Sequence, residues 1–254
     1  MTAHASYDGI DRPAPPSPAA AHASPMVRLL EPRDVPAAAT VLARAFAEEP
    51  AKSVLFGDVG SDGAPFRDEA TRTRFAEAVA IGRLRSAARY AAVHVAEVDG
   101  TVAAVAMWYP PGAKPKGPGA SLLHALTAPG TRVLTLLSSL SASLWRDRAA
   151  FKRLLANRNA AARQASRGPS WYLAVIGTDP DHRGRGLARL LLERTLERCD
   201  VEGLAAWLET TEEATAGMYE RFGFETVAAI DGGTVFPGLW IMRREPRTAP
   251  VERD

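Results

Sequence analysis

Residues 179–189 read DPDHRGRGLAR, and this stretch decides how the rest of the chain is interpreted. It follows the apolar run WYLAVIGT at 171–178, which predicts a strand, and leads into LARLLLERTLE at 187–197, which predicts a helix. Pro180 ends the strand, and Gly184 and Gly186 let the backbone approach a ligand closely. Backbone N–H groups at a helix N-terminus bind anions, and Arg183 and Arg185 add positive charge. The stretch therefore predicts a strand–turn–helix unit that binds a phosphorylated ligand.

Two common phosphate motifs are absent from this loop. The sequence contains neither the Gly-x-Gly-x-x-Gly of dinucleotide-binding folds nor the Gly-Lys-Ser/Thr of a P-loop. A run of Arg-Gly-Arg-Gly is also compatible with an ordinary glycine turn that carries solvated arginines. The preceding strand and the following helix favour the phosphate interpretation.

On both sides of the loop, strand-like and helical segments alternate. A short strand at 26–30 precedes helices that end before Pro50 and span about 67–89. Strands at 90–98 and 101–109 flank Asp99-Gly100, a dipeptide that favours a tight hairpin turn. After the loop come a strand at 204–210, a short helix at 214–223, and strands at 224–230 and 234–244. The predicted fold class is α/β, with a mixed central sheet flanked by helices.

The chain divides into one domain and two tails. Residues 1–25 are rich in alanine, proline and serine, which predicts a disordered N-terminal tail. Residues 26–246 form the predicted domain, and the polar residues 247–254 form a frayed C-terminal tail. Within the domain, about 112–168 is a helical insertion after a Pro/Gly-rich break. It is interpreted either as a packing arm or as a lid over a substrate site.

Composition restricts the possible partners. The 254 residues include 31 Lys+Arg and 29 Asp+Glu, a net charge of +2 that argues against nucleic acid or an anionic membrane as the main partner. No apolar run reaches the roughly 18 residues of a membrane span, and no secretory signal is recognisable. A single cysteine, Cys199, excludes an internal disulfide and a cysteine-based zinc cluster, and its apolar neighbours predict a packed thiol. We expect a cytoplasmic enzyme without a metal, and the sequence says nothing about oligomeric state.

Two motifs together carry a family resemblance. The run Arg183-Gly184-Arg185-Gly186-Leu187-Ala188 resembles the acetyl-CoA signature Arg/Gln-x-x-Gly-x-Gly/Ala of the GNAT superfamily of N-acetyltransferases. Tyr219-Glu220-Arg221-Phe222-Gly223-Phe224 resembles the Tyr-x-x-x-Gly-Phe that closes the GNAT core. The resemblance covers about residues 26–245 and is most similar to the puromycin N-acetyltransferase-like branch, whose Leu-Glu-Thr is here Leu208-Glu209-Thr210.

This resemblance implies a GNAT fold and acetyl-CoA as the acyl-donor cosubstrate. The N–H groups from Arg183 to Ala188 would hold the coenzyme A pyrophosphate, and the backbone of Val175, Ile176, Gly177 and Thr178 would pair with the pantetheine arm. Tyr219 carries over as the general acid that protonates the leaving thiolate; otherwise its ring simply packs. Many relatives have asparagine and alanine where this chain has Glu212 and Thr215, which puts the coenzyme contact of that asparagine in doubt.

The base and the acceptor pocket are less well defined. The strand before the loop starts with Ser170-Trp171-Tyr172 and lacks the carboxylate that several GNAT enzymes have there. Glu209 is therefore the best candidate for the base, and the alternative is that it pairs with a neighbouring side chain. Strand alternation places Tyr172 on the same face as Ala174 and Ile176, where it lines the cleft or packs in the core. The acceptor pocket candidates, each also compatible with ordinary surface or core, are Phe46, Glu48, Glu49, Trp108 and Tyr109.

The sequence therefore predicts an N-acetyltransferase that acetylates a primary amine of a small-molecule or peptide natural product, such as an antibiotic. Two alternatives stay open. One is a GNAT-fold module that binds acetyl-CoA without turnover. The other is a protein acetyltransferase that acts on lysines or N-termini.

Overall fold

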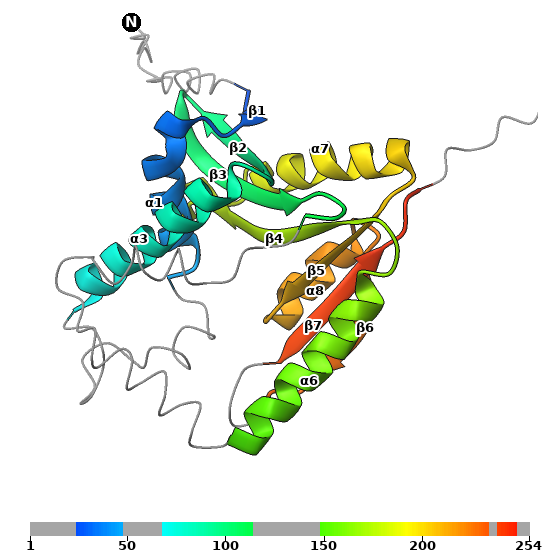
Figure 1. Ribbon diagram of the computed structural model, residues 1–254. Helices are drawn as coiled ribbons and strands as arrows, with labels where there is room; N and C mark the ends of the chain where they lie inside the picture. The colour runs from blue at the N-terminus through cyan, green and yellow to red at the C-terminus, as the bar shows by residue number, and fades with distance from the viewer. Residues whose placement is uncertain (1–23, 48–67, 114–147, 234–237, 248–254) are drawn as a thin grey trace, which may run out of the picture.

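The computed structural model describes residues 24–47, 68–113, 148–233 and 238–247. Seven strands form one sheet in the order β1-β2-β3-β4-β5-β7-β6 (Figure 1). The strands are β1 (Met26–Leu29), β2 (Ala92–Val98), β3 (Thr101–Tyr109), β4 (Ser170–Thr178), β5 (Ala205–Thr210), β6 (Glu225–Ile230) and β7 (Leu239–Arg244). The helices are α1 (Val35–Ala45), α3 (Glu69–Ala87), α6 (Arg148–Ala165), α7 (Leu187–Glu202) and α8 (Glu213–Glu220). Only β4 and β5 pair in parallel, so the prediction of a mixed α/β sheet is confirmed.

The hairpin of β2 and β3 follows from its turn residues. Asp99 and Gly100 have φ values of 50° and 75°, and a two-residue turn of this type needs positive φ at both positions. Val98 then pairs with Thr101 directly across the turn. In the predicted helical insertion, α6 confirms a helix at 148–165, whereas 114–147 lies outside the described residues, as do 1–23 of the predicted tail.

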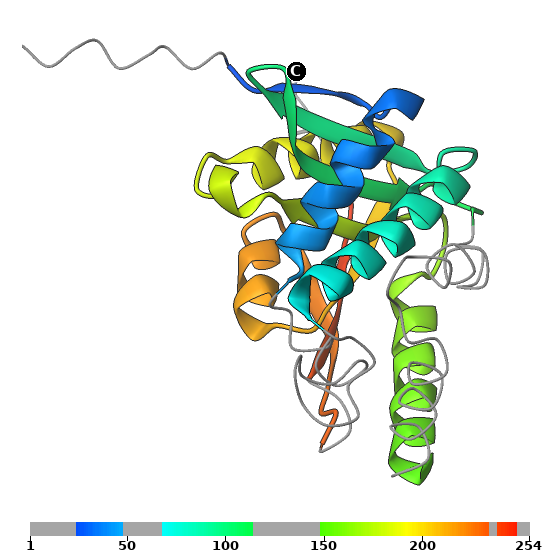
Figure 2. The same ribbon diagram turned by 90° about the vertical axis from the view of Figure 1, so that its left-hand side faces the viewer.

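Helices cover both faces of the sheet. Figure 2 shows α1 and α3 side by side across one face, where Leu42 and Leu84 pack with Val95 and Val105. On the opposite face α7 and α8 bury Leu191 and Tyr219 against β3, β4 and β5. On the face of α1 and α3, but over the other half of the sheet, α6 packs Ala161 and Ala165 on β7. No helix among the described residues is long and apolar enough to cross a membrane.

The sheet opens between β4 and β5. These neighbours pair only from Ser170 to Leu173 on β4 and from Ala205 to Leu208 on β5, and beyond these residues the two strands diverge (Figure 1). On the other side of β4, Met107 pairs with Val175 and Trp108 with Leu173, so Ala174 is an extra residue in a β-bulge. The open end of this V, next to the loop at 179–186, contains the cleft described below.

The bulge corrects one expectation of the sequence. Strict alternation placed Tyr172, Ala174 and Ile176 on one face, but Tyr172 and Ala174 pack on the α1/α3 side whereas Ile176 packs on the α7 side. The extra residue at the bulge shifts the alternation by one position, and a periodic pattern in the sequence carries no sign of such a shift.

Candidate active site

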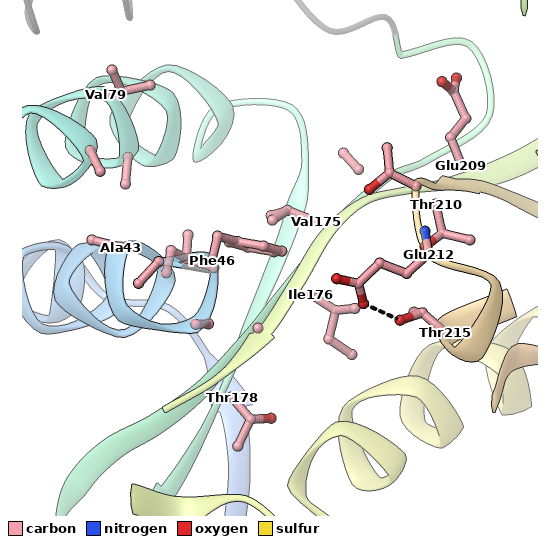
Figure 3. Close-up of a pocket in the computed structure, with 18 of the residues that line it drawn as sticks. Ala43, Phe46, Val79, Val175, Ile176, Thr178, Glu209, Thr210, Glu212 and Thr215 are labelled. Atoms are coloured by element: carbon pink, nitrogen blue, oxygen red, sulfur yellow. Dashed lines mark hydrogen bonds between the residues drawn. The ribbon is translucent and has the colours of Figure 1, made fainter. Parts of the chain in front are cut away.

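The cleft between the diverging strands has a volume of about 1070 Å³. One wall comes from the C-terminal end of α1 and from α3, and the opposite wall from α6, the end of β5 and the start of α8. Figure 3 shows α1 and α3 on one side of β4 and the end of β5 with the start of α8 on the other. The lining includes Phe46, Val79, Arg83, Leu155, Arg158, Val175, Ile176, Gly177, Thr178, Arg183, Ala188, Glu209, Glu212, Thr215 and Tyr219. A second cleft of about 940 Å³ shares Thr178, Arg183 and Ala188 with the first and continues past the loop between α7 and α8.

The glycine loop has the geometry of an anion site. Gly184 and Gly186 have φ values of 76° and 74°, in the left-handed region that favours glycine. Within the described part of the chain, the amide N–H groups of residues 184–189 have no protein acceptor, and the first bond across the helix start runs from Leu190 N–H to Gly186 O at 3.1 Å. A Cβ at either glycine would meet no atom within 4 Å, so the surface above the loop is open. Unpaired N–H groups at the N-terminus of α7 are the arrangement that binds phosphate.

The loop is held to the end of α1 by charged contacts. Arg44 donates from Nη1 to Asp179 at 2.9 Å and from Nη2 to Asp181 at 2.8 Å. Arg183 donates to the carbonyl oxygen of Ala45 at 3.2 Å, so its side chain also anchors the loop. Sequence reasoning missed Arg44, because only the fold brings it next to residues 135 positions later in the chain.

The strand segment expected to face a pantetheine arm does line the cleft. Val175, Ile176, Gly177 and Thr178 all lie on the open side of β4, past the bulge. At Gly177 a Cβ would come within 3.0 Å of Ala45 Cβ and 3.1 Å of a Leu42 methyl group. Glycine is therefore needed at 177 so that α1 can pack this closely on the strand.

Tyr219 lies in the cleft wall on α8. Only 4% of the residue is exposed, and its ring makes an edge contact with Phe224 at 5.8 Å between centroids. Burial raises the pKa of the phenol above its usual range, so the hydroxyl is protonated at neutral pH. None of the described residues provides a hydrogen-bond partner for this hydroxyl. A protonated phenol at a cleft is suited to donate a proton or a hydrogen bond to a bound group.

Glu209, the predicted base, is engaged by a cation. Arg158 of α6 donates to its two carboxylate oxygens, from Nε at 3.0 Å and from Nη2 at 2.5 Å. The Glu209 side chain is only 14% exposed. The bidentate arginine occupies both carboxylate oxygens, so neither is open to a proton of an amine while this ion pair is formed. Of the two roles weighed for Glu209, local pairing is the one that the geometry shows.

Glu212 is another carboxylate of the cleft. It lies at the N-cap position of α8, and its Oε2 accepts a hydrogen bond from the Thr215 hydroxyl at 3.0 Å. In Figure 3 its side chain extends from the end of β5 towards Ile176 on β4. Sequence comparison marked Glu212 only as a departure from the asparagine of relatives, and its place in the cleft is new from the structure.

The aromatic residues proposed for the acceptor pocket are distributed differently from expectation. Trp108 is fully buried in the core on the α7 side, and neither Trp108 nor Tyr109 is among the described residues that line the cleft. Tyr109, Tyr172 and Trp207 are cross-strand partners whose rings stack at 6.1 and 4.1 Å between centroids. Burial, and next the Glu209 carboxylate, raise the pKa of Tyr172 to about 12. This row packs in the core, which corrects the expectation that Tyr109 and Trp108 line the pocket, and of the two alternatives for Tyr172 the structure shows packing in the core.

Of the remaining candidates, Phe46 lines the cleft at the end of α1, whereas Glu48 and Glu49 lie outside the described residues. Cys199 is buried, and this burial raises the pKa of its thiol to about 12, so the thiol packs as predicted. Among the described residues, no three His, Cys, Asp or Glu side chains are close enough to hold a metal ion.

Known proteins resemble this chain in sequence and in structure. Residues 145–226 match the family described as "Acetyltransferase (GNAT) domain". Over 82 residues the chain is 37% identical to an uncharacterized N-acetyltransferase of Schizosaccharomyces pombe, which covers 31% of this chain and 33% of the relative. Over 89 residues it is 30% identical to the mycothiol acetyltransferase of Propionibacterium freudenreichii subsp. shermanii, which covers 34% of this chain and 28% of the relative. The matched segments thus span about a third of these curated relatives.

Solved structures also match over nearly the whole chain. One of them is described as "histone acetyltransferase HPA2 and related acetyltransferase" from Corynebacterium glutamicum. The match has a TM-score of 0.60 and 22% identity, and covers 90% of this chain and 99% of that chain. At this identity the likeness shows the fold, a mixed seven-stranded sheet with flanking helices.

Proposed function

We propose that this chain, which carries a GNAT acetyltransferase domain, is an acetyl-CoA-dependent N-acetyltransferase that acetylates a primary amine. The observation that supports the proposal most directly is the loop at 183–188. The N–H groups of residues 184–188 have no acceptor among the described residues, and the loop lines a cleft that meets the cleft of Tyr219 at Arg183 and Ala188, so one ligand can extend from the loop to Tyr219. Such a ligand has a phosphorylated end and a reactive end, as acetyl-CoA does.

The residues present fit coenzyme A. Two left-handed glycines keep the loop surface open, and Arg183 and Ala188 lie where the two clefts meet. The N–H groups of Gly184 to Ala188 would hold the pyrophosphate, whereas the N–H of Arg183 already donates to the carbonyl oxygen of Pro180 at 3.3 Å. The backbone of Val175 to Thr178 would pair with the pantetheine arm. When bound, acetyl-CoA supplies an activated acetyl group whose carbon–sulfur bond breaks as the amine nitrogen bonds to the carbonyl carbon.

Tyr219 would provide the proton for the leaving sulfur. Burial keeps its phenol protonated at neutral pH, and Tyr219 lines the cleft with no hydrogen-bond partner for its hydroxyl among the described residues. A hydrogen bond that strengthens as negative charge develops on sulfur stabilises the transition state more than the ground state. A protonated amine loses two protons on its way to the amide. Glu209 can accept the first of these protons only if its ion pair with Arg158 opens.

For the acceptor we propose an amine of a small-molecule or peptide natural product, such as an antibiotic. The resemblance of Leu208-Glu209-Thr210 to the puromycin N-acetyltransferase-like branch supports this class, and so does the apolar side chain of Phe46 in the cleft. We also retain the expectation of a cytoplasmic enzyme, since acetyl-CoA is found there. The bidentate Arg158–Glu209 pair favours a second candidate, a module that binds acetyl-CoA without turnover.

Thiol release from acetyl-CoA distinguishes these functions. The purified chain is assayed against a panel of amines that includes puromycin, tryptamine, spermidine and a lysine peptide, while binding of acetyl-CoA is followed by thermal shift. An enzyme stabilises with acetyl-CoA and releases thiol with at least one amine. Stabilisation without release by any amine supports the binding module. Acetylation of the peptide alone supports a protein acetyltransferase, and no stabilisation refutes the proposal.

A further inference from the structure

Two carboxylates at the junction of β5 and α8 differ in their partners. Glu209 is bound by the guanidinium of Arg158 through both oxygens. Glu212 accepts one neutral hydrogen bond, from Thr215, and no Lys, Arg or His among the described residues lies within ion-pair distance of it. Figure 3 shows the two side chains pointing in different directions, with Glu212 extending towards Ile176 and Glu209 away from it. Glu212 is thus the carboxylate of this pair that is open to a cation from the cleft.

Glu212 lies at the start of a helix and keeps most of its hydrogen-bonding capacity. It stands at the N-cap position of α8, where the helix dipole stabilises negative charge. Thr215 donates to Oε2, which leaves Oε1 and the remaining lone pairs of the carboxylate for a ligand. A primary ammonium has three donors and is the matching group.

The rest of the cleft limits what can be attached to that ammonium. Apolar side chains contribute to both walls, and they include Phe46, Phe75 and Val79 on one side and Leu154, Leu155 and Leu239 on the other. Among them, Leu155 is 43% exposed, so a ligand in the cleft can cover apolar surface that is now in contact with solvent. Burial of an apolar group against such walls is favourable.

The other charges of the cleft oppose a second cation. Arg72 and Arg83 line it from one face of α3, eleven residues apart, and Glu69 is the acidic residue of that helix in the lining. Arg83 donates to the carbonyl oxygen of Ala174 in the bulge at 3.0 Å, and a carbonyl oxygen carries no charge that would compensate the guanidinium. Because Arg158 on the opposite wall is paired with Glu209, an acceptor with several ammonium groups would meet like charges on the wall of Arg72 and Arg83.

We infer that Glu212 binds the protonated amine of the acceptor, and that this acceptor carries a single ammonium group on an apolar body rather than being a polyamine. The inference rests on the proposed function, because it names the acceptor class of the same cleft. Glu212 is here a binding residue, which places the amine nitrogen at the open side of β4 beside Ile176. It replaces Glu209 as the carboxylate that the acceptor contacts first.

Calorimetric titration with three probes in the presence of coenzyme A tests this. Tryptamine has one ammonium on an apolar ring, tryptophol replaces that ammonium with a hydroxyl, and spermidine is a polyamine. We expect wild type to bind tryptamine at least about tenfold more tightly than either of the others, as expected for one hydrogen bond to a charged group. Glu212→Gln keeps the shape of the side chain but removes its charge, so the variant should bind tryptamine only as weakly as wild type binds tryptophol. Glu213→Gln is the matched control, because Glu213 is exposed like Glu212 but lies outside the cleft lining.

Four results would overturn the inference: no tryptamine binding by wild type, tighter binding of spermidine, equal loss in the control, or an unchanged Glu212→Gln variant with a wild-type melting temperature. Failure of the proposed function is recognised separately, by the absence of any thermal shift with acetyl-CoA. In that case the same titrations are run without coenzyme A, and the comparison of Glu212→Gln with Glu213→Gln still decides whether the carboxylate binds ammonium.

Discussion

Replacing Gly186 with leucine tests the anion site directly. Gly186 has a φ of 74°, and a non-glycine residue in the left-handed region costs about 1–2 kcal/mol. A Cβ there meets nothing within 4 Å, so no steric clash adds to this cost. For a domain of this size each kcal/mol corresponds to about 2–4 °C, so the variant should melt about 2–8 °C below wild type and still fold.

The effect on coenzyme binding should be much larger than the effect on folding. Acetyl-CoA at about 100 times its dissociation constant stabilises the native state by about 2.7 kcal/mol, which is about 5–11 °C for wild type. A leucine side chain over the loop occupies the space in which phosphate oxygens must approach the N–H groups, so the variant should lose this gain entirely. Thermal shift with and without acetyl-CoA measures both quantities on one sample.

Gly203 provides a matched control at the other end of the same helix. It caps the C-terminus of α7 with a φ of 66°, and a Cβ there also meets nothing within 4 Å. Gly203→Leu should therefore show the same loss of melting temperature but the full stabilisation by acetyl-CoA. A Gly186→Leu protein that gains as much from acetyl-CoA as Gly203→Leu does would refute the assignment of the loop.

Three further predictions concern single residues. Tyr219→Phe should lower kcat by about 10–100-fold on an accepted amine and leave KM nearly unchanged. This loss is at the lower end of what general acid catalysis contributes, because a thiolate leaves readily. Steady-state thiol release measures it, and a variant that keeps most of its kcat would mean that the proton comes from another group. Burial, and then Arg194 and Arg198, lower the pKa of His94 to about 4. Because unfolded His94 binds a proton below about pH 6.5 and the folded residue does not until about pH 4, the native state loses stability as pH falls through this window, and His94→Gln should lose less between pH 7 and 4.5 in thermal melts. Asp200→Ala should lower the free energy of unfolding by about 3–5 kcal/mol in urea denaturation, because it leaves the nearly buried guanidinium of Arg244 without its carboxylate. The control is Glu202→Ala, which removes a carboxylate paired with Arg198 at the surface and should change the free energy of unfolding by no more than about 0.5 kcal/mol.

Much of the fold could be predicted because its signals are local. The hairpin turn at Asp99-Gly100, the glycines of the loop and the apolar runs of β3 and β4 each determine the conformation of the residues that carry them. The anion site is also a local feature, because a glycine turn before a helix exposes the N–H groups of the helix start wherever the unit lies in the fold.

Contacts between distant segments could not be predicted in this way. The bulge at Ala174 reverses the face of Ile176, yet it arises from the pairing of β3 with β4 and leaves no periodic signal in either strand. The same limitation explains Trp108, because an aromatic residue at a strand end has the same sequence pattern in a pocket as in a core.

The sequence by itself determined the order of strands and helices, the hairpin and the glycine loop, because each depends on backbone preferences and apolar spacing within a few residues. Only the tertiary structure decided which carboxylate of the β5–α8 junction is open to the cleft. Glu209 and Glu212 are three residues apart and chemically alike, but α6 brings Arg158 to the first and leaves the second facing β4. Their difference comes from a helix that precedes them by about fifty residues, and no local pattern contains that information.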